Sequence, residues 1–363
     1  MHVLAAVVLC IWIVVFVQTI VNILAVPRLD RGAQPNALPF VSIVVPARNE
    51  ERTIDRAVRA FLAQDYGSFE VIVVNDRSID RTGEILRTIA DRRLTIVDGI
   101  EPPAEWLGKP WALQQGSEAA KGEVLLFVDA DLVYAPETLR AAIADLEQSG
   151  VAMLALFPRM EMRTFAEHVA MPMLAFFAFS GMPLWRVNRS SSPRFALGGG
   201  SGNIIRRAAL ESIGGFQPLR DAVVDDVGLA RVAREAHLTT RIVRADDLIR
   251  VRMYHSAHEI AAGFTKNAFP ALGRSYAMAA LMLALMAVLH VFPYAFLWIP
   301  TIVLISLTRL VLFRSLRYPL LNAIFLHPLM VAFWAYIFLR SIWFTGVRNE
   351  VHWRGRTYNA SVI

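Results

Sequence analysis

Residues 41–50 read Val-Ser-Ile-Val-Val-Pro-Ala-Arg-Asn-Glu, an apolar run that ends abruptly in polar residues. A short apolar run of this kind is typical of a strand that is buried on both faces of a sheet. Three further runs have the same character, and we predict strands there as well, at residues 71–74, 124–128 and 151–156.

Helical patterns separate the predicted strands, at residues 52–63, 81–90, 111–120 and 136–147. Strands that alternate with helices predict βαβ units and therefore a largely parallel sheet. The sequence thus predicts an α/β domain over residues 38–254. In a sheet of this kind, ligands bind at the carboxyl ends of the strands.

Acidic residues stand at those predicted strand ends. Glu50 follows the first strand, Asp76 follows the second, and Asp129 and Asp131 follow the third, while Asp226 stands at a predicted helix start. Carboxylates are costly to bury there unless a cation pairs with them, and a divalent cation that bridges a diphosphate would do so. Asp129-x-Asp131 alone is a weak signal, but the ordered set predicts a functional site that binds a divalent cation.

The amino-terminal run predicts a membrane span. Residues 3–26 carry no charge, and an apolar run of this length can cross a hydrocarbon core of about 30 Å. Arg28 and Arg31 follow it, and the positive-inside rule then places the next domain in the cytosol. A cleaved secretory signal remains an alternative, although only His2 precedes the apolar run.

The carboxyl-terminal third is apolar again. Residues 277–313 are long enough for a helical hairpin and residues 319–344 for a further span, which makes four spans in all. With three spans after a cytosolic domain, the tail bearing Arg348, Arg354 and Arg356 would lie outside, against the positive-inside rule. Either one segment is re-entrant or the tail breaks the rule.

Residues 167–187 form a separate apolar stretch that Pro172, Gly181 and Pro183 interrupt. It is too broken for a span, and we expect a helix in the membrane interface or the wall of a lipid-acceptor cleft. A buried core helix is the alternative.

The composition agrees with a membrane protein. Hydrophobic residues make up 55% and charged residues 19% of the chain, and the excess lies in blocks at the two ends. The net charge of +6 comes without a Lys/Arg run interleaved with aromatics, so we expect no nucleic acid partner. Cys10 is the single cysteine, which excludes an intrachain disulfide and a thiolate metal cage.

We therefore expect five segments. They are a transmembrane helix at 1–27, a cytosolic catalytic domain at 38–254, an interfacial amphipathic segment at 255–275, transmembrane helices at 276–345 and a basic tail at 346–363. The expected location is the inner (plasma) membrane, with the catalytic domain facing the cytoplasm.

Several motifs together resemble those of the family 2 glycosyltransferases. They are residues 41–50, the Asp76 segment, Asp129-Ala-Asp131, Gly214-Gly-Phe216 and Asp225-Asp226-x-x-Leu229, and the resemblance covers about residues 39–269. Residues 106–112, Trp-Leu-Gly-Lys-Pro-Trp-Ala, look like the hopanoid- and carotenoid-associated members. Residues 351–358, Val-His-Trp-Arg-Gly-Arg-Thr-Tyr, are similar to the ending of membrane-bound members. The resemblance implies an inverting enzyme with the GT-A fold, a Rossmann-like, mixed but mostly parallel sheet.

The resemblance also implies roles for single residues. The uridine would be held by Pro46, Ala47, Glu50 and Asp76, and the diphosphate or ribose would be met by Lys109. The nucleotide-sugar and Mg²⁺ or Mn²⁺ would be bound by Asp129 and Asp131. The general base would be Asp226, with Asp225 orienting the site. The base takes the proton of the acceptor hydroxyl as its oxygen attacks the anomeric carbon.

One feature of the sequence departs from that pattern, and a second has two interpretations. Processive members carry Gln-x-x-Arg-Trp after the base, whereas this chain has Gly-Phe-Thr-Lys266-Asn in residues 263–267. This favours transfer of a single sugar, with Lys266 either near the leaving diphosphate or binding anionic lipid at the interface. The glycines of residues 198–203 allow a ligand to approach closely, and a plain flexible loop is the alternative.

The predicted function is transfer of one sugar from a nucleotide-sugar, expected to be a UDP-sugar, to a membrane lipid acceptor of the hopanoid, carotenoid, polyprenyl phosphate or glycolipid class. A processive polysaccharide synthase is the alternative within the family. A nucleotidyltransferase would need a basic, Gly-rich phosphate loop after the first strand, and Ala-Arg-Asn-Glu at 47–50 is not one. A degenerate membrane scaffold would have lost the carboxylates.

Overall fold

The chain folds as two compact units, which the computed structural model describes over residues 1–222, 224–353 and 356–359. The sheet unit comprises Ala25–Glu161 and Leu184–Arg252. The helical unit comprises Met1–Leu24, Met162–Pro183 and Met253–Ile363. Of the tail motif noted in the sequence, Arg354 and Gly355 lie outside the described residues.

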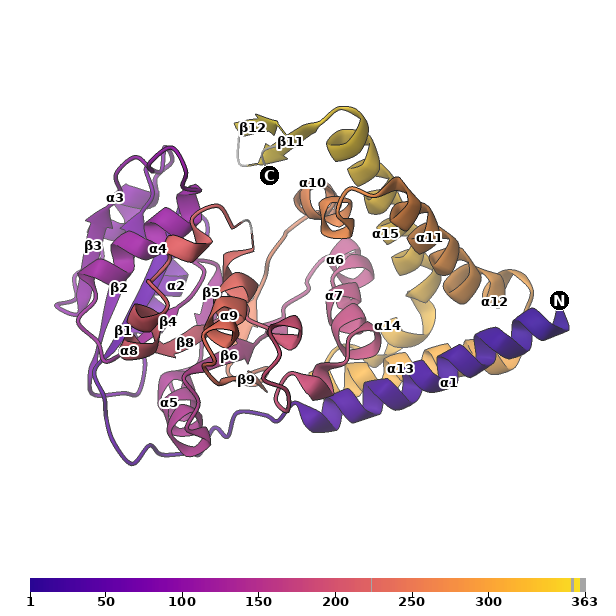
Figure 1. The fold of residues 1–363 in the computed structure, drawn as a ribbon, viewed down its shortest axis with the longest axis horizontal. Coiled ribbons are helices and arrows are strands. Elements are labelled where there is room, and N and C mark those ends of the chain that lie inside the picture. The colour runs from indigo at the N-terminus through magenta and orange to yellow at the C-terminus, as the bar shows by residue number, and fades with distance from the viewer. Residues whose placement is uncertain (223, 354–355, 360–363) are drawn as a thin grey trace. The chain divides into compact units, whose positions relative to one another are not determined.

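Seven strands form the main sheet, in the order β3–β2–β1–β4–β8–β6–β9 (Figure 1). Their bounds are β1 Val41–Ala47, β2 Phe69–Asn75, β3 Leu94–Asp98, β4 Val124–Phe127, β6 Met153–Phe157, β8 Asn203–Arg206 and β9 Thr240–Arg244. Strand β8 runs antiparallel to both of its neighbours, and the other pairs are parallel. The sheet is therefore mixed and mostly parallel, which confirms the predicted fold class.

Helices flank this sheet, and all of them except α8 lie where the sequence predicted helices. Their bounds are α2 Ile54–Leu62, α3 Thr82–Arg87, α4 Gly108–Ala119, α5 Thr138–Ser149, α8 Arg207–Ser212 and α9 Asp225–Glu235. Helix α4 approaches β1 unusually closely, because a Cβ on Gly116 would lie 2.4 Å from Cγ1 of Val44. One apolar cluster, which includes Val44, Leu113 and Leu229, joins the sheet to α4 and α9. Its burial from water fixes both helices on the sheet.

The sequence did not predict β3. It is the edge strand of the sheet, and its residues are half-buried or exposed, so it lacks a continuous apolar run. A second small sheet, in the order β5–β10–β7, was also unpredicted. Its strands are only two or three residues long: β5 Leu132–Tyr134, β7 Arg159–Met160 and β10 Ile249–Val251.

The helical unit contains four helical runs that are long and apolar enough to cross a membrane, among the described residues. They are His2–Ala25, Tyr276–Ala295, Ile299–Leu316 and His327–Val347, the number that the sequence predicted. The elements of this unit are α1 His2–Ala25, α6 Phe165–Ala170, α7 Pro172–Phe176, α10 Ala257–Ala268, α11 Tyr276–Met286, α12 Phe292–Ala295, α13 Ile299–Leu316, α14 Leu320–Phe325, α15 His327–Ser341, β11 Glu350–Trp353 and β12 Arg356–Asn359.

Polar residues of α1 hold it to the broken apolar stretch. Asn22 is fully buried, and its amide donates 2.7 Å hydrogen bonds to the carbonyls of Phe179 and Met182. Thr19 donates to Oγ of Ser180, at 2.9 Å. These carbonyls lie in and just after a π-helical turn, Phe177–Gly181, where the regular helical hydrogen bonding is interrupted. Residues 162–183 therefore belong to the helical unit, although the sequence places them inside the 38–254 segment.

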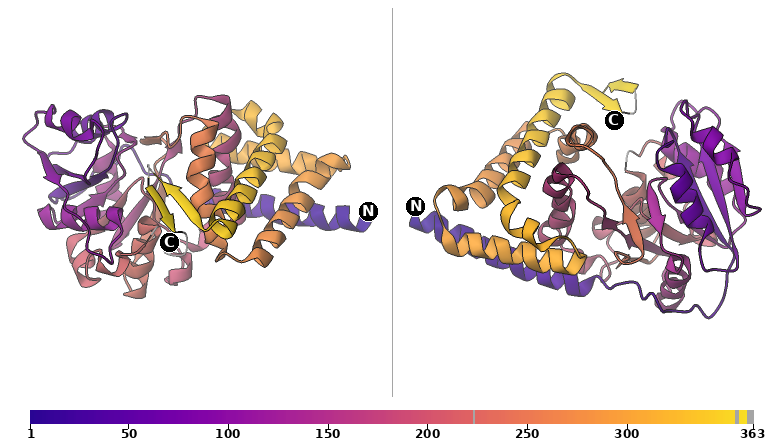
Figure 2. Two further views of the ribbon diagram at one scale, coloured as in Figure 1. Left: turned by 90° about the horizontal axis from the view of Figure 1, so that it is seen from above. Right: turned by 180° about the vertical axis from the view of Figure 1, so that it is seen from behind.

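Helix α13 runs alongside α1 in the same direction (Figure 2). Ala5 and Leu9 of α1 line one small pocket with residues 297–301. Farther along both helices, Trp12 and Arg309 reach the same ring, that of Phe176, at 6.2 Å and 6.0 Å. The carboxyl-terminal end of α13 therefore lies toward the carboxyl-terminal end of α1.

Helices α14 and α15 turn back from there. The Arg309 guanidinium, in the middle of α13, donates to the carbonyl of Ala323 in α14 at 2.8 Å. Helix α15 begins beside α11–α12, where His327 lies 3.1 Å from His290. At its other end, the Ser341 hydroxyl accepts a 2.8 Å hydrogen bond from the N–H of Phe269, just before α11. Helices α11 and α15 are therefore antiparallel.

Two helices of this unit begin with the same capping arrangement. Thr164 caps α6 through the N–H of Glu167, and the Glu167 carboxylate accepts from the N–H of Arg163 at 2.8 Å. Ser256 likewise caps α10 through Glu259, whose carboxylate accepts from the backbone N–H of the preceding His255 at 2.8 Å. Each is a capping box, which satisfies amides that a helix start leaves open.

Candidate functional site

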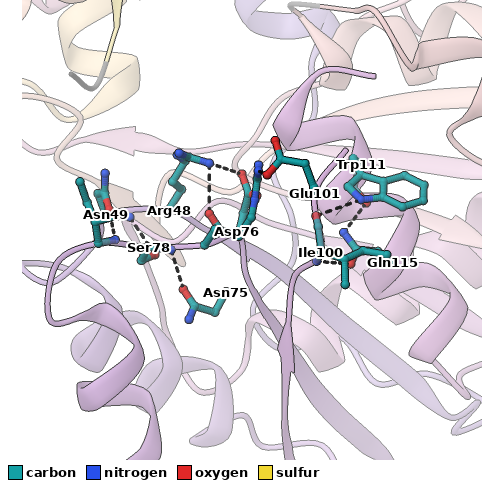
Figure 3. A network of polar contacts seen from close by, with 11 residues as sticks. Arg48, Asn49, Asn75, Asp76, Ser78, Ile100, Glu101, Trp111 and Gln115 are labelled. Carbon is teal, nitrogen blue, oxygen red and sulfur yellow. Dashed lines mark hydrogen bonds and ion pairs between the residues drawn. The ribbon is translucent and has the colours of Figure 1, made fainter. Parts of the chain in front are cut away.

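Asp76 lies at the carboxyl end of β2 and is held from both sides (Figure 3). Its N–H donates to the carbonyl of Ala47, which follows Pro46 at the end of β1, at 2.8 Å. Its carboxylate, 7% exposed, pairs with Arg48 at 3.2 Å and Arg77 at 3.0 Å. The two strand ends thus meet at one carboxylate, as expected for parallel neighbours.

The loops after β1 and β2 are joined by further hydrogen bonds. The N–H of Asn49 donates to the Ser78 hydroxyl at 3.0 Å, and the N–H of Glu50 donates to the Thr82 hydroxyl at 2.7 Å. The Glu50 carboxylate accepts from the Thr53 hydroxyl at 2.9 Å. Asn49 and Arg77 have positive φ values of 55° and 52°. Such backbone conformations are uncommon outside glycine and cluster at functional sites.

The start of α4 lies directly against Asp76. A Cβ on Gly108 would lie 3.0 Å from Oδ2 of Asp76, so the bare backbone approaches the carboxylate closely. Beside it, the indole N–H of Trp111 donates to the carbonyl of Ile100, and the N–H of Ile100 donates to Gln115 (Figure 3). This network places the Trp-Leu-Gly-Lys-Pro-Trp-Ala segment at the edge of the Asp76 site.

Lys109 joins two of the predicted acidic residues. Its Nζ lies 2.8 Å from Asp129 and 3.2 Å from Asp225. Burial alone would lower the pKa of Lys109, but the carboxylates around it, that of Asp129 foremost, raise it well above its usual value. Burial raises the pKa of Asp225 to about 6, and the Lys109 ammonium offsets this only in part. Lys109 is therefore charged and, with 39% of its side chain exposed, paired with two carboxylates.

The backbone of Gly200 connects Asp129 with Asp226. Its carbonyl accepts from the N–H of Asp129 at 2.9 Å, and its N–H donates to Oδ2 of Asp226 at 2.7 Å. A Cβ on Gly200 would lie 2.0 Å from Oδ2 of Asp129, and one on Gly198 would lie 2.1 Å from the Asp226 carbonyl. Gly198 and Gly200 are therefore required by close contacts, and this segment is not a plain flexible loop.

Asp226 lies in the first turn of α9, as the sequence predicted. Besides the Gly200 N–H, its carboxylate accepts from the N–H of Val227 at 2.8 Å. The Asn203 amide donates to the Asp226 carbonyl at 3.1 Å. The partial positive charge at a helix start favours an ionised carboxylate there. This arrangement fixes the direction of the Asp226 side chain.

Asp129 and Asp131 flank the buried Ala130, and β5 begins at the next residue. Asp129 keeps 40% of its side chain exposed. No group of three or more His, Cys, Asp or Glu side chains that could hold a metal occurs among the described residues. Two hard carboxylates without a complete cage nevertheless fit Mg²⁺ or Mn²⁺, because such ions are held by one or two carboxylates together with substrate phosphates.

One predicted residue lies in the other unit. Lys266 lies on α10 of the helical unit, whereas every other predicted site residue lies in the sheet unit. Sequence reasoning also gave no role to Arg77, Tyr134 or the Gly200 backbone. The Tyr134 hydroxyl donates to the Ser201 carbonyl at 2.6 Å and so supports the glycine loop. The clustered glycines before β8 were the signal that could have identified this loop.

Comparison with known proteins gives one family and several relatives. Residues 42–214 match the sequence model of "Glycosyl transferase family 2". A beta-monoglucosyldiacylglycerol synthase from Trichormus variabilis is 29% identical over 217 residues, 57% of this chain and 44% of that protein. The chain thus spans less than half the length of that relative. A 4,4'-diaponeurosporenoate glycosyltransferase from Staphylococcus aureus is 23% identical over 342 residues, which cover 88% of both chains.

Among solved structures, a mannosyltransferase from Pyrobaculum calidifontis, in complex with GDP-Man and Mn²⁺, matches 93% of this chain and 96% of its own. The TM-score is 0.53 at 20% sequence identity. This similarity shows a shared fold.

Proposed function

Since this chain carries a family 2 glycosyltransferase domain, we propose that it moves a single sugar from a nucleotide-sugar onto a membrane lipid, with inversion at the anomeric carbon. The observation that carries the proposal is the hydrogen-bonded chain from Asp129 through Gly200 to Asp226. This chain connects Asp129, whose carboxylate is suited to the donor diphosphate, with Asp226, whose carboxylate is suited to act as a base.

The nucleoside would bind where β1 and β2 end. Asp76 and Glu50 offer carboxylate oxygens for the base or ribose, and Pro46 and Ala47 provide the adjoining backbone. Support comes from the hydrogen bonds that fix these loops to one another, because a prearranged site loses less entropy on binding. We expect a uridine nucleotide.

The diphosphate would bind between Asp129, Asp131 and Lys109. Asp129 and Asp131 would hold Mg²⁺ or Mn²⁺, which when bound offsets the charge that develops on the leaving diphosphate. The ammonium of Lys109 now pairs with Asp129 and Asp225, and on donor binding it would pair with phosphate oxygens instead. Lys109 thus neutralises negative charge in this site with and without the donor.

Asp226 would act as the general base. Its carboxylate would take the proton of the acceptor hydroxyl while the hydroxyl oxygen bonds to the anomeric carbon and the nucleoside diphosphate leaves. The Gly200 and Val227 N–H groups support this role, because they aim the carboxylate. A displacement in one step from the face opposite the leaving group inverts the anomeric centre.

A lipid is the proposed acceptor. Two relatives are named for acting on lipid-like molecules, a diacylglycerol glycolipid and a carotenoid acid. The helical unit of this chain provides apolar helices that could place the enzyme in the membrane where such acceptors lie.

We further propose that α1, α11–α12 and α13 cross the membrane and that α14–α15 is re-entrant. Most of the chain between α1 and α11, Ala25–Glu161 and Leu184–Arg252, forms the sheet unit, so we place the end of α1 and the start of α11 on the same side of the membrane. Because α13 runs with α1, its end returns to that side, and α15 runs back against α11 to the same side.

This topology resolves the conflict between four full spans and the positive-inside rule. Arg28 and the tail residue Arg348 would both lie on the side of the sheet unit, which the positive-inside rule makes the cytosol. The fully buried Asn22, which bonds to Phe179 and Met182, supports an α1 that is retained rather than cleaved.

The test is incubation of membranes that contain the protein with a panel of radiolabelled UDP-sugars and GDP-mannose. We expect one donor to label a lipid-extractable product that carries one sugar, and Asp226→Asn to abolish the label. Sugar polymers would favour a processive synthase. No lipid label from any donor, with donor turnover intact, would overturn the lipid acceptor.

A further inference from the structure

We propose that Arg274, Arg340 and Arg348 of the helical unit form a binding site for the phosphate of an anionic phospholipid headgroup. This lipid site goes beyond the sugar-transfer reaction and rests on the proposed insertion in a membrane. The three arginines come from two segments, the turn before α11 and the end of α15.

The two segments are in direct contact. A Cβ on Gly346 would lie 2.8 Å from the ring of Phe269 and 3.0 Å from the Tyr276 hydroxyl. Arg274 donates to the side-chain oxygen of Asn349 at 3.4 Å. Figure 1 shows the start of α11 and the end of α15 at the same end of the helical unit.

Two of the arginines bury a donor without an acceptor. Nη2 of Arg274 and Nε of Arg340 are inaccessible to solvent and have no hydrogen-bond partner among the described residues. A buried N–H of a charged group is costly when it is left unpaired. The hydrogen bonding of both guanidiniums is therefore incomplete within the described residues, and an anion would bind through their other N–H groups.

No carboxylate of the described residues pairs with any of the three arginines. Arg340 and Arg348 lie instead over the same ring, that of Phe344, at 5.2 Å and 5.6 Å from its centroid. Stacking on an aromatic face fixes a guanidinium and leaves its N–H fork open to a phosphate. The cluster therefore has positive charge, fixed geometry and unused donors.

The backbone at the contact is in an uncommon conformation. Arg274 and Asn349, which bond to each other, both have a positive φ of 55°. For residues other than glycine this costs free energy and persists only where the surroundings hold it. In this conformation the Arg274 side chain reaches Asn349, which follows the end of α15.

The surroundings favour a lipid over a soluble anion. Tyr276 and Trp343 at these helix ends are 56% and 51% exposed. Aromatic residues at the ends of membrane helices lie at the level of the headgroups. Arginines at the same helix ends therefore meet lipid phosphates at high local concentration.

The experiment is a titration of the purified full-length protein, in neutral detergent, with short-chain phosphatidylglycerol and phosphatidylcholine, read by native mass spectrometry. We expect wild type to bind phosphatidylglycerol about 5-fold more tightly than Arg348→Gln or Arg340→Gln does. Arg348 is exposed, so its replacement does not endanger folding. Arg340→Lys keeps the positive charge, so comparing it with Arg340→Gln separates the effect of lost packing from the effect of lost charge.

Arg314→Gln is the matched control. Arg314 is exposed in the last turn of α13, on the proposed same side of the membrane, and its variant should bind like wild type. An equal loss in Arg314→Gln would show diffuse attraction rather than a site. Equal affinity for the two lipids, or displacement of the lipid by millimolar phosphate or UDP, would also overturn the proposal. Sugar transfer measured on the same samples reports the proposed function separately.

Discussion

The backbone N–H of Gly200 donates a 2.7 Å hydrogen bond to the carboxylate of Asp226. The same residue accepts from the N–H of Asp129, at 2.9 Å. The backbone of this one residue therefore links the two aspartates that the proposed reaction needs. Positioning of this kind contributes strongly to catalysis, because small displacements of reacting groups reduce rates steeply.

Replacing Gly200 should disturb this spacing. The new Cβ of Gly200→Ala would lie 2.0 Å from Oδ2 of Asp129, so one of the two must move. We expect kcat to fall by roughly 100-fold. Gly199→Ala is the control, since its Cβ would meet Ser201 at an ordinary 3.4 Å. Equal kinetics in the two variants would argue against the positioning role of Gly200.

Asp226→Asn should remove transfer and leave donor binding nearly intact. The amide keeps the shape of the side chain but cannot take a proton, and a general base typically contributes about 10²–10⁴-fold. Steady-state kinetics give the rate, and calorimetry gives donor affinity. A variant that keeps more than about a third of wild-type turnover would remove Asp226 from the role of base.

Activity should require a divalent cation. Asp129→Asn and Asp131→Asn should each weaken the response to Mg²⁺ or Mn²⁺, because each removes a charged oxygen that the ion prefers. The measurement is initial rate against metal concentration after chelation with EDTA. Full activity with metal confirmed absent would contradict the proposed role of this pair.

Asp225 should make the stability of the ligand-free protein depend on pH. Its pKa is about 6 when folded, above the unfolded value of about 3.9, so between these values the folded state binds more protons. The free energy of unfolding should therefore rise as pH falls from about 7 to 5, by about 1 kcal/mol from this group.

The measurement is the melting temperature in detergent with EDTA at pH 5 and 7.5, for wild type and Asp225→Asn. The asparagine variant lacks this titration, so its advantage at pH 7.5 should shrink at pH 5. A difference between the two proteins that stays constant with pH would contradict the raised pKa.

Lys266→Ala tests whether α10 takes part in the reaction. If Lys266 meets the leaving diphosphate, kcat should fall by at least about 10-fold, about 1.4 kcal/mol of barrier, with a smaller change in KM for the donor. Lys121→Ala, at an exposed position of the sheet unit, is the control. An unchanged kcat in detergent, with weaker membrane association, would assign Lys266 to lipid contact instead.

The sequence was sufficient for the side chains at the strand ends. Asp76, Asp129 and Asp131 follow apolar runs, and a parallel sheet brings such positions to one edge. It was insufficient for Gly200, because a backbone N–H and carbonyl look the same at every position of a sequence. Only the fold shows which backbone residue lies between the two aspartates.

The same limit holds for the helical unit. Apolar length indicated four spans, but length does not reveal that α14 returns to the middle of α13, where Arg309 bonds to Ala323. Residues 162–183 were placed by position in the chain, whereas the contacts of Asn22 assign them to the helical unit. Both features depend on long-range contacts that local patterns do not contain.

The matching capping boxes at Thr164 and Ser256 bear on how the chain is made. Thr164 follows β7 and Ser256 follows β10, and these two strands form a parallel pair. Glu167 and Glu259 each return to a backbone amide within their own segment. Each box thus satisfies amides near its helix start with residues of its own segment. The first turns of α6 and α10 can therefore form co-translationally, without contacts from the helices that are synthesised after them.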